Sequence, residues 1–255
     1  MLYRSAGEGS PVVLIHGFAE DGTIWQNQEP ALSQNHRLLV PDLPGSGRSS
    51  INPQLKTIVD LADSIAIMLE TEKIEQAMVI GHSMGGYVAL AFAEKYPSKM
   101  KGLGLIHSTA FADNEEKKSI RRKAIEFICQ HGAAEFLNQS IPNLFAEEFR
   151  QDHPEIVSEL IERYNNFNSR SLVSYYHAMI DRPDRRHVLE EIQKPVFFVI
   201  GEKDSVIPIT SSLQECRLPD LCYIHILECA GHMGMWECSS ETTELLRKFL
   251  IQATE

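Results

Sequence analysis

A chain of 255 residues is long enough for one large α/β domain that encloses a site, or for two small domains. Its 35 acidic residues outnumber its 24 lysines and arginines, and the resulting net charge of -11 repels nucleic acids and anionic lipid surfaces. We therefore expect neither nucleic acid nor a membrane as a partner.

Two features indicate the cellular compartment. The first residues, MLYRSAGEGS, lack the apolar core of a signal peptide, and no apolar run approaches the roughly 20 residues that span a bilayer. The cysteines are odd in number and unlike a disulfide framework: Cys129, Cys216, Cys222, Cys229 and Cys238. We expect a cytoplasmic protein with reduced thiols.

Short apolar runs flanked by Gly, Pro or Asp are typical of central strands buried on both faces. They predict strands at Val12–Ile15, Leu38–Val40, Met78–Ile80, Gly104–Ile106, Val196–Ile200 and Cys222–Glu228. Thr57–Glu70 has apolar residues at helical spacing, and Thr57 with Asp60 approximates a capping box. This alternation predicts an α/β fold: a mostly parallel central sheet flanked by helices, with the active site at the strands' carboxyl ends.

The alternation stops between about Phe111 and His187, where a charged and aromatic stretch contains no strand-like run. We expect three or four helices there, forming a helical cap (residues 111–187) inserted into a core made of residues 1–110 and 188–255. Aromatic side chains and a methionine recur through the cap: Phe127, Phe136, Phe145, Phe149, Tyr164, Phe167, Tyr175, Tyr176 and Met179. Most should pack within the cap, and a few should face the cleft below it.

Gly81-His82-Ser83-Met84-Gly85 fits the G-x-S-x-G pattern, with a strand before it and the helical stretch GYVALAFAEKY after it. Such a sharp strand-to-helix turn strains its corner residue, and side chains two positions away would collide there. The two glycines remove the collision and leave the Ser83 hydroxyl exposed. Ser83 is therefore the candidate nucleophile.

A serine hydroxyl needs a general base, and the base needs a carboxylate to orient it. His232 follows the last predicted strand and is the best base candidate, whereas we expect His16 and His82 to serve local packing. Asp204 lies just past the strand Val196–Ile200 and is the preferred carboxylate. Asp42 also ends a strand and is the rival candidate. We expect Asp42 to brace the turn that follows it, so it is the less favoured carboxylate.

Acyl transfer also needs backbone N–H donors for an oxyanion hole. Met84 follows the nucleophile and begins a helix. Phe18 follows a strand, and the glycine before it lets its backbone come close to the reacting group. The backbone N–H groups of Met84 and Phe18 are therefore the candidate oxyanion donors. Trp25, Met233 and Met235 are candidates for the apolar walls of the substrate-binding site.

Together these motifs resemble the α/β-hydrolase fold superfamily, in particular its small capped esterase-like members, over essentially the whole chain. The matching stretches are His16-Gly17-Phe18, Asp42 through Ser49, Gly81 through Gly85, Gly201 through Asp204 and Gly231-His232. The chain order Ser83, Asp204, His232 is also that of the superfamily. The resemblance implies the family fold and the catalytic triad roles. Two departures are visible: little room precedes Val12 for the family's first strand, and Cys238 stands where a proline often follows the final histidine.

The leading hypothesis is a serine hydrolase that cleaves a small or medium carboxylic ester or thioester through an acyl-enzyme intermediate. The runner-up is hydrolytic or eliminative cleavage of a carbon–carbon bond in a carboxylated metabolite, whose acid Arg122, Arg182 or Arg185 would hold. A third is a module that binds a small molecule without rapid turnover. A zinc site at Cys229 and His232 is disfavoured because regular cysteine pairs are missing, and we expect no metal and no organic cofactor. The sequence carries no signal for an oligomeric state.

Overall fold

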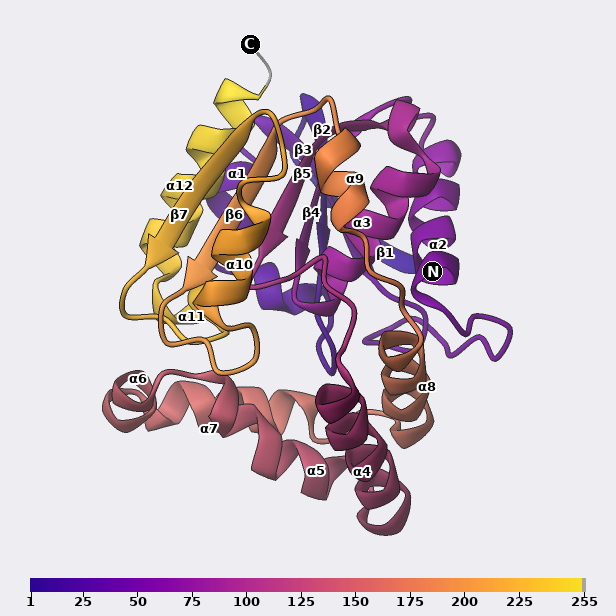
Figure 1. Ribbon diagram of the computed structural model, residues 1–255, viewed down its shortest axis with the longest axis vertical. Coiled ribbons are helices and arrows are strands. Elements are labelled where there is room, and N and C mark those ends of the chain that lie inside the picture. The colour runs from indigo at the N-terminus through magenta and orange to yellow at the C-terminus, as the bar shows by residue number, and fades with distance from the viewer. Residues whose placement is uncertain (254–255) are drawn as a thin grey trace.

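The computed structural model describes residues 1–253, and within them seven strands form one sheet in the order β1-β3-β2-β4-β5-β6-β7 (Figure 1). The strands are β1 (Leu2–Ala6), β2 (Ser10–Ile15), β3 (His36–Asp42), β4 (Ala77–His82), β5 (Met100–Ile106), β6 (Val196–Gly201) and β7 (Cys222–Leu227). β1 runs antiparallel to β3, and the other neighbouring pairs are parallel. This confirms the predicted α/β fold and each of the predicted strands.

Strand β1 corrects the expectation that little room precedes Val12 for a further strand. Its residues LYRSA are exposed or half-buried, and they pair with β3 from Leu2 opposite Asp42 to Ala6 opposite Leu38. A polar edge strand of this kind lacks the continuous apolar run by which the inner, doubly covered strands are recognised.

Helices cover both faces of the sheet, as Figure 1 shows. The front layer contains α3 (Met84–Lys95), α9 (Arg186–Glu191) and α10 (Ile209–Glu215), and α2 (Ile58–Thr71) packs against α3. The layer behind the sheet contains α1 (Glu29–Leu32) and α12 (Ser239–Gln252). The short helix α11 (Gly234–Glu237) comes just before α12 in the chain. Short 3-10 turns lie at Gly22–Trp25, Pro97–Lys99 and Ile141–Leu144. At the start of α2, Thr57 accepts the Asp60 N–H and Asp60 accepts the Thr57 N–H, which confirms the predicted capping box.

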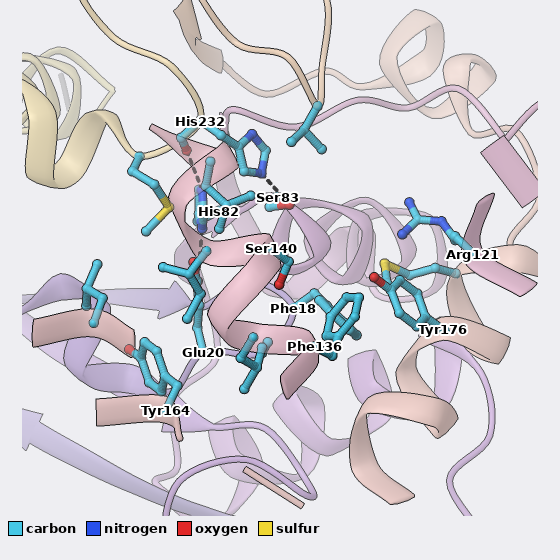
Figure 2. Close-up of a pocket in the computed structure, with 18 of the residues that line it drawn as sticks. Phe18, Glu20, His82, Ser83, Arg121, Phe136, Ser140, Tyr164, Tyr176 and His232 are labelled. Atoms are coloured by element: carbon cyan, nitrogen blue, oxygen red, sulfur yellow. Dashed lines mark hydrogen bonds and ion pairs between the residues drawn. The ribbon is translucent and has the colours of Figure 1, made fainter. Parts of the chain in front are cut away.

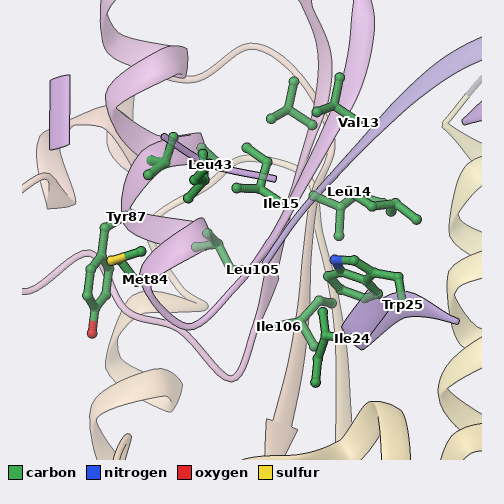
Figure 3. Packing of buried hydrophobic residues seen from close by; sticks show 14 of the residues in the cluster. Val13, Leu14, Ile15, Ile24, Trp25, Leu43, Met84, Tyr87, Leu105 and Ile106 are labelled. Atoms are coloured by element: carbon green, nitrogen blue, oxygen red, sulfur yellow. The ribbon is translucent and has the colours of Figure 1, made fainter. Parts of the chain in front are cut away.

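The core lies on both sides of the central strands. In β4, Val79 is fully buried and lies between Val13 of β2 and Leu103 of β5. Figure 3 shows Trp25 packed near Leu14, whereas Met84 lies on the other side of the cluster. These inner strands buried on both faces hold the carboxyl edge of the sheet rigid, and the candidate site is built on that edge.

A helical insert separates β5 from β6 and contains α4 (Glu115–His131), α5 (Ala133–Ser140), α6 (Glu147–Asp152), α7 (Pro154–Tyr164), α8 (Ser169–Ile180) and α9. In Figure 1, α4 to α8 lie across the edge where the parallel strands end, whereas α9 returns to the layer in front of the sheet beside α3. The division into a core and a cap at residues 111–187 stays a prediction.

Among the helices of residues 1–253, none combines the length and the apolar character that crossing a bilayer requires.

Candidate active site

Ser83 occupies the turn between β4 and α3 in a strained backbone conformation, with φ 51° and ψ -116°. The space around the turn is nearly filled by backbone. A Cβ on Gly81 would lie 2.1 Å from the Gly85 carbonyl oxygen, and a Cβ on Gly85 would lie 2.5 Å from the Ile15 carbonyl oxygen. Larger residues at either position would therefore push the turn apart, as the sequence analysis predicts.

The three side chains of the predicted triad form one hydrogen-bonded chain. The Ser83 Oγ–H donates to His232 Nε2 over 2.8 Å, and the His232 Nδ1–H donates to Asp204 Oδ2 over 2.8 Å. Figure 2 shows the first of these contacts beside the cavity described below. The ends of β4, β6 and β7 lie along one sheet edge and bring together side chains that are up to 149 positions apart in the sequence. This arrangement lets a neutral imidazole accept the serine proton.

Asp204 is almost fully buried and well supplied with donors. Its Oδ1 accepts the N–H groups of Val206 at 2.8 Å and Ile207 at 2.9 Å. Burial alone would raise the pKa of this carboxyl, but His232, His107 and their hydrogen bonds lower it below its usual range. Asp204 is therefore a fixed anion beside the His232 ring.

His107, at the end of β5, forms a second contact with Asp204 that the sequence analysis does not predict. Its Nε2 accepts the Gly234 N–H at 3.2 Å, so its Nδ1 carries the proton and faces Asp204 Oδ2 at 3.4 Å. Complete burial lowers the pKa of His107 to about 4, so the ring is neutral at physiological pH.

Glu237 holds the loop that carries His232. Its carboxylate accepts the N–H groups of Gly231 at 3.0 Å, Met233 at 2.9 Å and, from the insert, Ala146 at 2.7 Å. The His232 N–H itself donates to the Leu144 carbonyl at 2.7 Å. The loop that carries His232 is thus held by α11 on one side and by the helical insert on the other.

A buried ion pair joins three segments under Ser83. Glu20 Oε2 accepts the Gly17 N–H at 2.7 Å and lies 3.0 Å from His82 Nδ1, and His82 Nε2 lies 3.0 Å from the His232 carbonyl oxygen. Burial alone would lower the pKa of His82, yet the adjacent Glu20 carboxylate raises it; burial would raise the pKa of Glu20, yet His82 lowers it. Both shifts favour the charged pair, in which both His82 nitrogens donate.

We expect Glu20→Gln to destabilise the fold by about 3 kcal/mol near pH 6, because it leaves a buried imidazolium without its counter-charge. Since the folded pKa of His82 is raised, the stabilisation is fully present below about pH 6.5 and is lost as the pH rises through the raised value. Thermal unfolding of the wild type and the variant between pH 6 and pH 9 measures this, and the difference should shrink as the pH rises.

Glu8→Gln, at an exposed glutamate, is the matched control. If the Glu8 and Glu20 variants unfolded at the same temperature at pH 6, the structural role of the pair would be refuted. Because the pair also holds the Gly17 turn and the His232 carbonyl, Glu20→Gln should lower kcat more than it changes KM.

Asp42 serves a different purpose from Asp204. Its Oδ1 accepts the Gly22 N–H at 3.0 Å, and its Oδ2 accepts both the backbone N–H of Arg48 at 3.1 Å and the side-chain Nε–H of Arg48 at 2.9 Å. This confirms the bracing role expected for Asp42. His16 also has a local role, as expected, because its Nε2 accepts the Leu43 N–H at 2.9 Å.

Metal binding can be assessed from the candidate ligands. Among the described residues, His107, Asp204 and His232 form a group whose possible metal-ligand atoms lie within 4.8 Å of one another. Both His232 nitrogens and the Nε2 of His107 are already engaged in hydrogen bonds. Cys229 is exposed and is not part of this group.

A cavity of about 170 Å³ lies between the sheet edge and the insert, with Ser83 and His232 in its wall. Its lining is mostly apolar: Phe18, Ala19, Glu20, His82, Ser83, Tyr87, Arg121, Phe136, Leu137, Ser140, Ile141, Leu144, Leu160, Tyr164, Tyr176, Met179, Val206, His232 and Met233. Phe136, Tyr164, Tyr176 and Met179 come from the predicted aromatic set of the cap, which confirms that a few of that set face the cleft. An apolar cavity of about 150 Å³ is known to hold benzene, so this one suits small groups.

The two predicted oxyanion donors come from segments next to Ser83. Met84 is the first residue of α3, so its N–H belongs to the first turn, where amides have no intrahelical partner. Phe18 follows Gly17, at which a Cβ would lie only 3.2 Å from the Ser83 Cβ. The Phe18 ring lines the cavity and lies 4.2 Å from the Tyr176 ring between centroids.

Of the three apolar wall candidates, the structure places only Met233 in the cavity lining. Trp25 and Met235 are fully buried and lie outside the lining, so their assignment to the substrate site is corrected. Trp25 belongs to a 3-10 turn that packs it into the core, and the Met235 side chain points inward from α11.

The arginines proposed to hold an acid are placed elsewhere. Arg182 pairs with Asp113, Arg185 pairs with Glu94, and Arg122 is exposed; none of them lines the cavity, whereas their neighbour Arg121 does.

Comparison with known proteins agrees with the fold described above. The family profile for the alpha/beta hydrolase fold matches residues 10–238. A thermophilic esterase from Thermogutta terrifontis, solved with malate bound, is similar with a TM-score of 0.94 and 29% identity, covering 99% of this chain and 93% of that one. The dihydrolipoyllysine-residue acetyltransferase component of an acetoin cleaving system from Pseudomonas putida is 28% identical over 97% of this chain, which spans only 65% of that protein's length. A 2-hydroxy-6-oxo-2,4-heptadienoate hydrolase, also from Pseudomonas putida, is 25% identical, with 97% of this chain and 91% of that protein covered. The chain therefore belongs to the α/β-hydrolase fold family.

Proposed function

We propose that the protein is a serine hydrolase that cleaves a small or medium carboxylic ester or thioester through an acyl-enzyme intermediate. The observation that carries the proposal is the chain of 2.8 Å hydrogen bonds from Ser83 through His232 to Asp204 beside a small apolar cavity. Membership of the family and the likeness to an esterase support the same reading.

In the proposed mechanism, Ser83 Oγ attacks the carbonyl carbon while His232 Nε2 takes its proton. The N–H groups of Met84 and Phe18 donate to the oxygen that becomes negative, and Asp204 stabilises the imidazolium that forms. His232 then gives the proton to the departing alcohol or thiol, which leaves the acyl group on Ser83. A water molecule, activated by the same imidazole, releases the acid.

Esters and thioesters varied separately in acyl and alcohol length test the substrate class. We expect the highest kcat/KM for short to medium acyl groups, because the cavity of about 170 Å³ is small and is lined by apolar side chains such as Phe136 and Leu144. Equal or higher activity on long-chain, interfacial lipid substrates would overturn this expectation.

Carbon–carbon bond cleavage is the alternative reaction, which the likeness to the heptadienoate hydrolase supports. Steady release of product from carboxylated vinylogous diketones, with esters left intact, would favour it. A third class, a binding module without turnover, would release a single equivalent of chromogenic alcohol and then stop, whereas a hydrolase releases product continuously.

A further inference from the structure

Arg121 brings a positive charge into an otherwise apolar part of the cavity. It projects from α4, its side chain is 11% exposed, and it is the one arginine or lysine in the lining formed by the described residues. In Figure 2 it lies beside Tyr176, on the side of Ser83 opposite Tyr164. Any substrate group that extends from Ser83 toward Tyr176 therefore approaches the guanidinium.

The guanidinium has donor capacity to spare. Its Nε–H donates to Asp113 Oδ2 at 2.5 Å and its Nη2 contacts Asp113 Oδ1 at 3.5 Å. Within residues 1–253, Nη1 has no hydrogen-bond partner. The Tyr176 ring lies 5.6 Å from Arg121 Cζ and contributes only its π face.

Asp113 does not neutralise this charge, because it is shared. Arg182 Nη1 lies 2.9 Å from Asp113 Oδ1, and Arg182 also stacks 3.9 Å above the Tyr87 ring. Two guanidinium groups thus flank one buried carboxylate and leave an excess of one positive charge. The other charged pair in the lining, Glu20 with His82, is balanced within itself.

An excess charge in a largely desolvated place is unfavourable unless a ligand supplies the opposite charge. We propose that Arg121 forms an anion subsite of the catalytic cavity and that the preferred substrate carries a carboxylate. This inference rests on the proposed ester or thioester hydrolysis and narrows it.

The lining between Ser83 and Arg121 indicates the form of such a substrate. The Phe18 and Phe136 rings, 6.4 Å apart, and the Tyr176 ring form an apolar wall along this path. A short hydrocarbon chain with an ester at one end and a carboxylate at the other fits this pattern, as in a half-ester of a dicarboxylic acid. The carboxylate would take the free Nη1–H donor of Arg121.

Methyl half-esters of succinic to suberic acid, each compared with the analogue in which a neutral carboxamide replaces the carboxylate, test the proposal. The wild type should prefer the half-ester of the best chain length by about 10- to 100-fold in kcat/KM, the range expected for a hydrogen bond to a charged group. Arg121→Gln should abolish this preference, mainly through KM. Asp113 keeps its Arg182 partner in this variant, so the fold should persist.

Arg122→Gln is the matched control, since it removes the same charge from an exposed neighbouring position. It should keep the wild-type preference. A preference for the half-ester that survives in Arg121→Gln would overturn the subsite, and so would hydrolysis of the half-ester and its carboxamide at equal kcat/KM by the wild type.

Binding of glutarate separates the subsite from the hydrolysis. Glutarate should raise the melting temperature of the wild type and of Arg122→Gln more than that of Arg121→Gln. If the wild type hydrolysed none of the esters yet showed this difference, the proposed function would fail and the subsite would stand. Equal stabilisation of all three proteins by glutarate would refute the subsite.

Discussion

Replacing Ser83 by alanine should lower kcat for ester hydrolysis by about 10⁴- to 10⁶-fold, as expected when the nucleophile of a coupled triad is lost. The effect should be this large because the strained turn places the attacking oxygen, Ser83 Oγ, 2.8 Å from the base, His232 Nε2, and alanine has no oxygen to put there. Steady-state kinetics on a soluble short-chain ester measures the change.

The Ser83→Ala variant should remain folded, because the hydroxyl has a hydrogen bond only to His232 among the described side chains. Ser50→Ala, at an exposed serine, serves as the control and should keep wild-type kinetics. A loss of less than about tenfold in folded Ser83→Ala, far below the effect expected for a nucleophile, would show that the hydroxyl is not the attacking group.

Asp204→Asn should lower kcat by about 10³- to 10⁴-fold with little change in KM. The carboxylate accepts the His232 Nδ1–H at 2.8 Å and so fixes the tautomer in which Nε2 can take the serine proton. An asparagine in its place can present its amide group to His232 and hold the wrong tautomer. The imidazolium formed during the reaction would also lose its counter-charge.

Asp42→Asn is the matched comparison, because Asp42 also ends a strand and is also buried. It should leave most of kcat intact and lower the melting temperature by about 2–4 °C, the shift expected for a loss of about 1 kcal/mol. The loss is modest because the paired Arg48 side chain is half exposed. A near-normal kcat in Asp204→Asn beside a collapsed kcat in Asp42→Asn would reverse the two roles.

The inner strands and the turn at Ser83 were predictable because their signals are local. A strand that is covered on both faces requires a continuous apolar run. The turn requires glycine at positions 81 and 85, because a Cβ atom at either would lie within 3 Å of backbone atoms. Strand β1 carries no such signal, because it is a polar edge strand that β3 orders by pairing.

The side chains that line the cavity were harder to predict, because the sequence does not give the rotational phase of a helix. Arg121 and Arg122 are adjacent on α4 and point about 100° apart, so only one of them faces the cavity. Met233 and Met235 flank the start of α11 and likewise point to different sides, one into the cavity and one into the core.

Buried polar pairs depend on tertiary contacts and were missed for that reason. Glu20 and His82 lie 62 positions apart, and His107 approaches Asp204 across neighbouring strands. Neither pair has a spacing that the sequence could reveal. The glycine before His82 indicated only that this histidine lies at the end of a strand, and not that it pairs with Glu20.

The central claim is that Ser83 is an activated nucleophile, and labelling with a fluorophosphonate followed by peptide mass analysis tests it most directly. The wild type should be modified on the peptide that contains Ser83, Asp204→Asn should react far more slowly, and Ser83→Ala should not react at that peptide. Labelling of Ser83→Ala at the wild-type rate, or modification of the wild type at another residue, would contradict the claim.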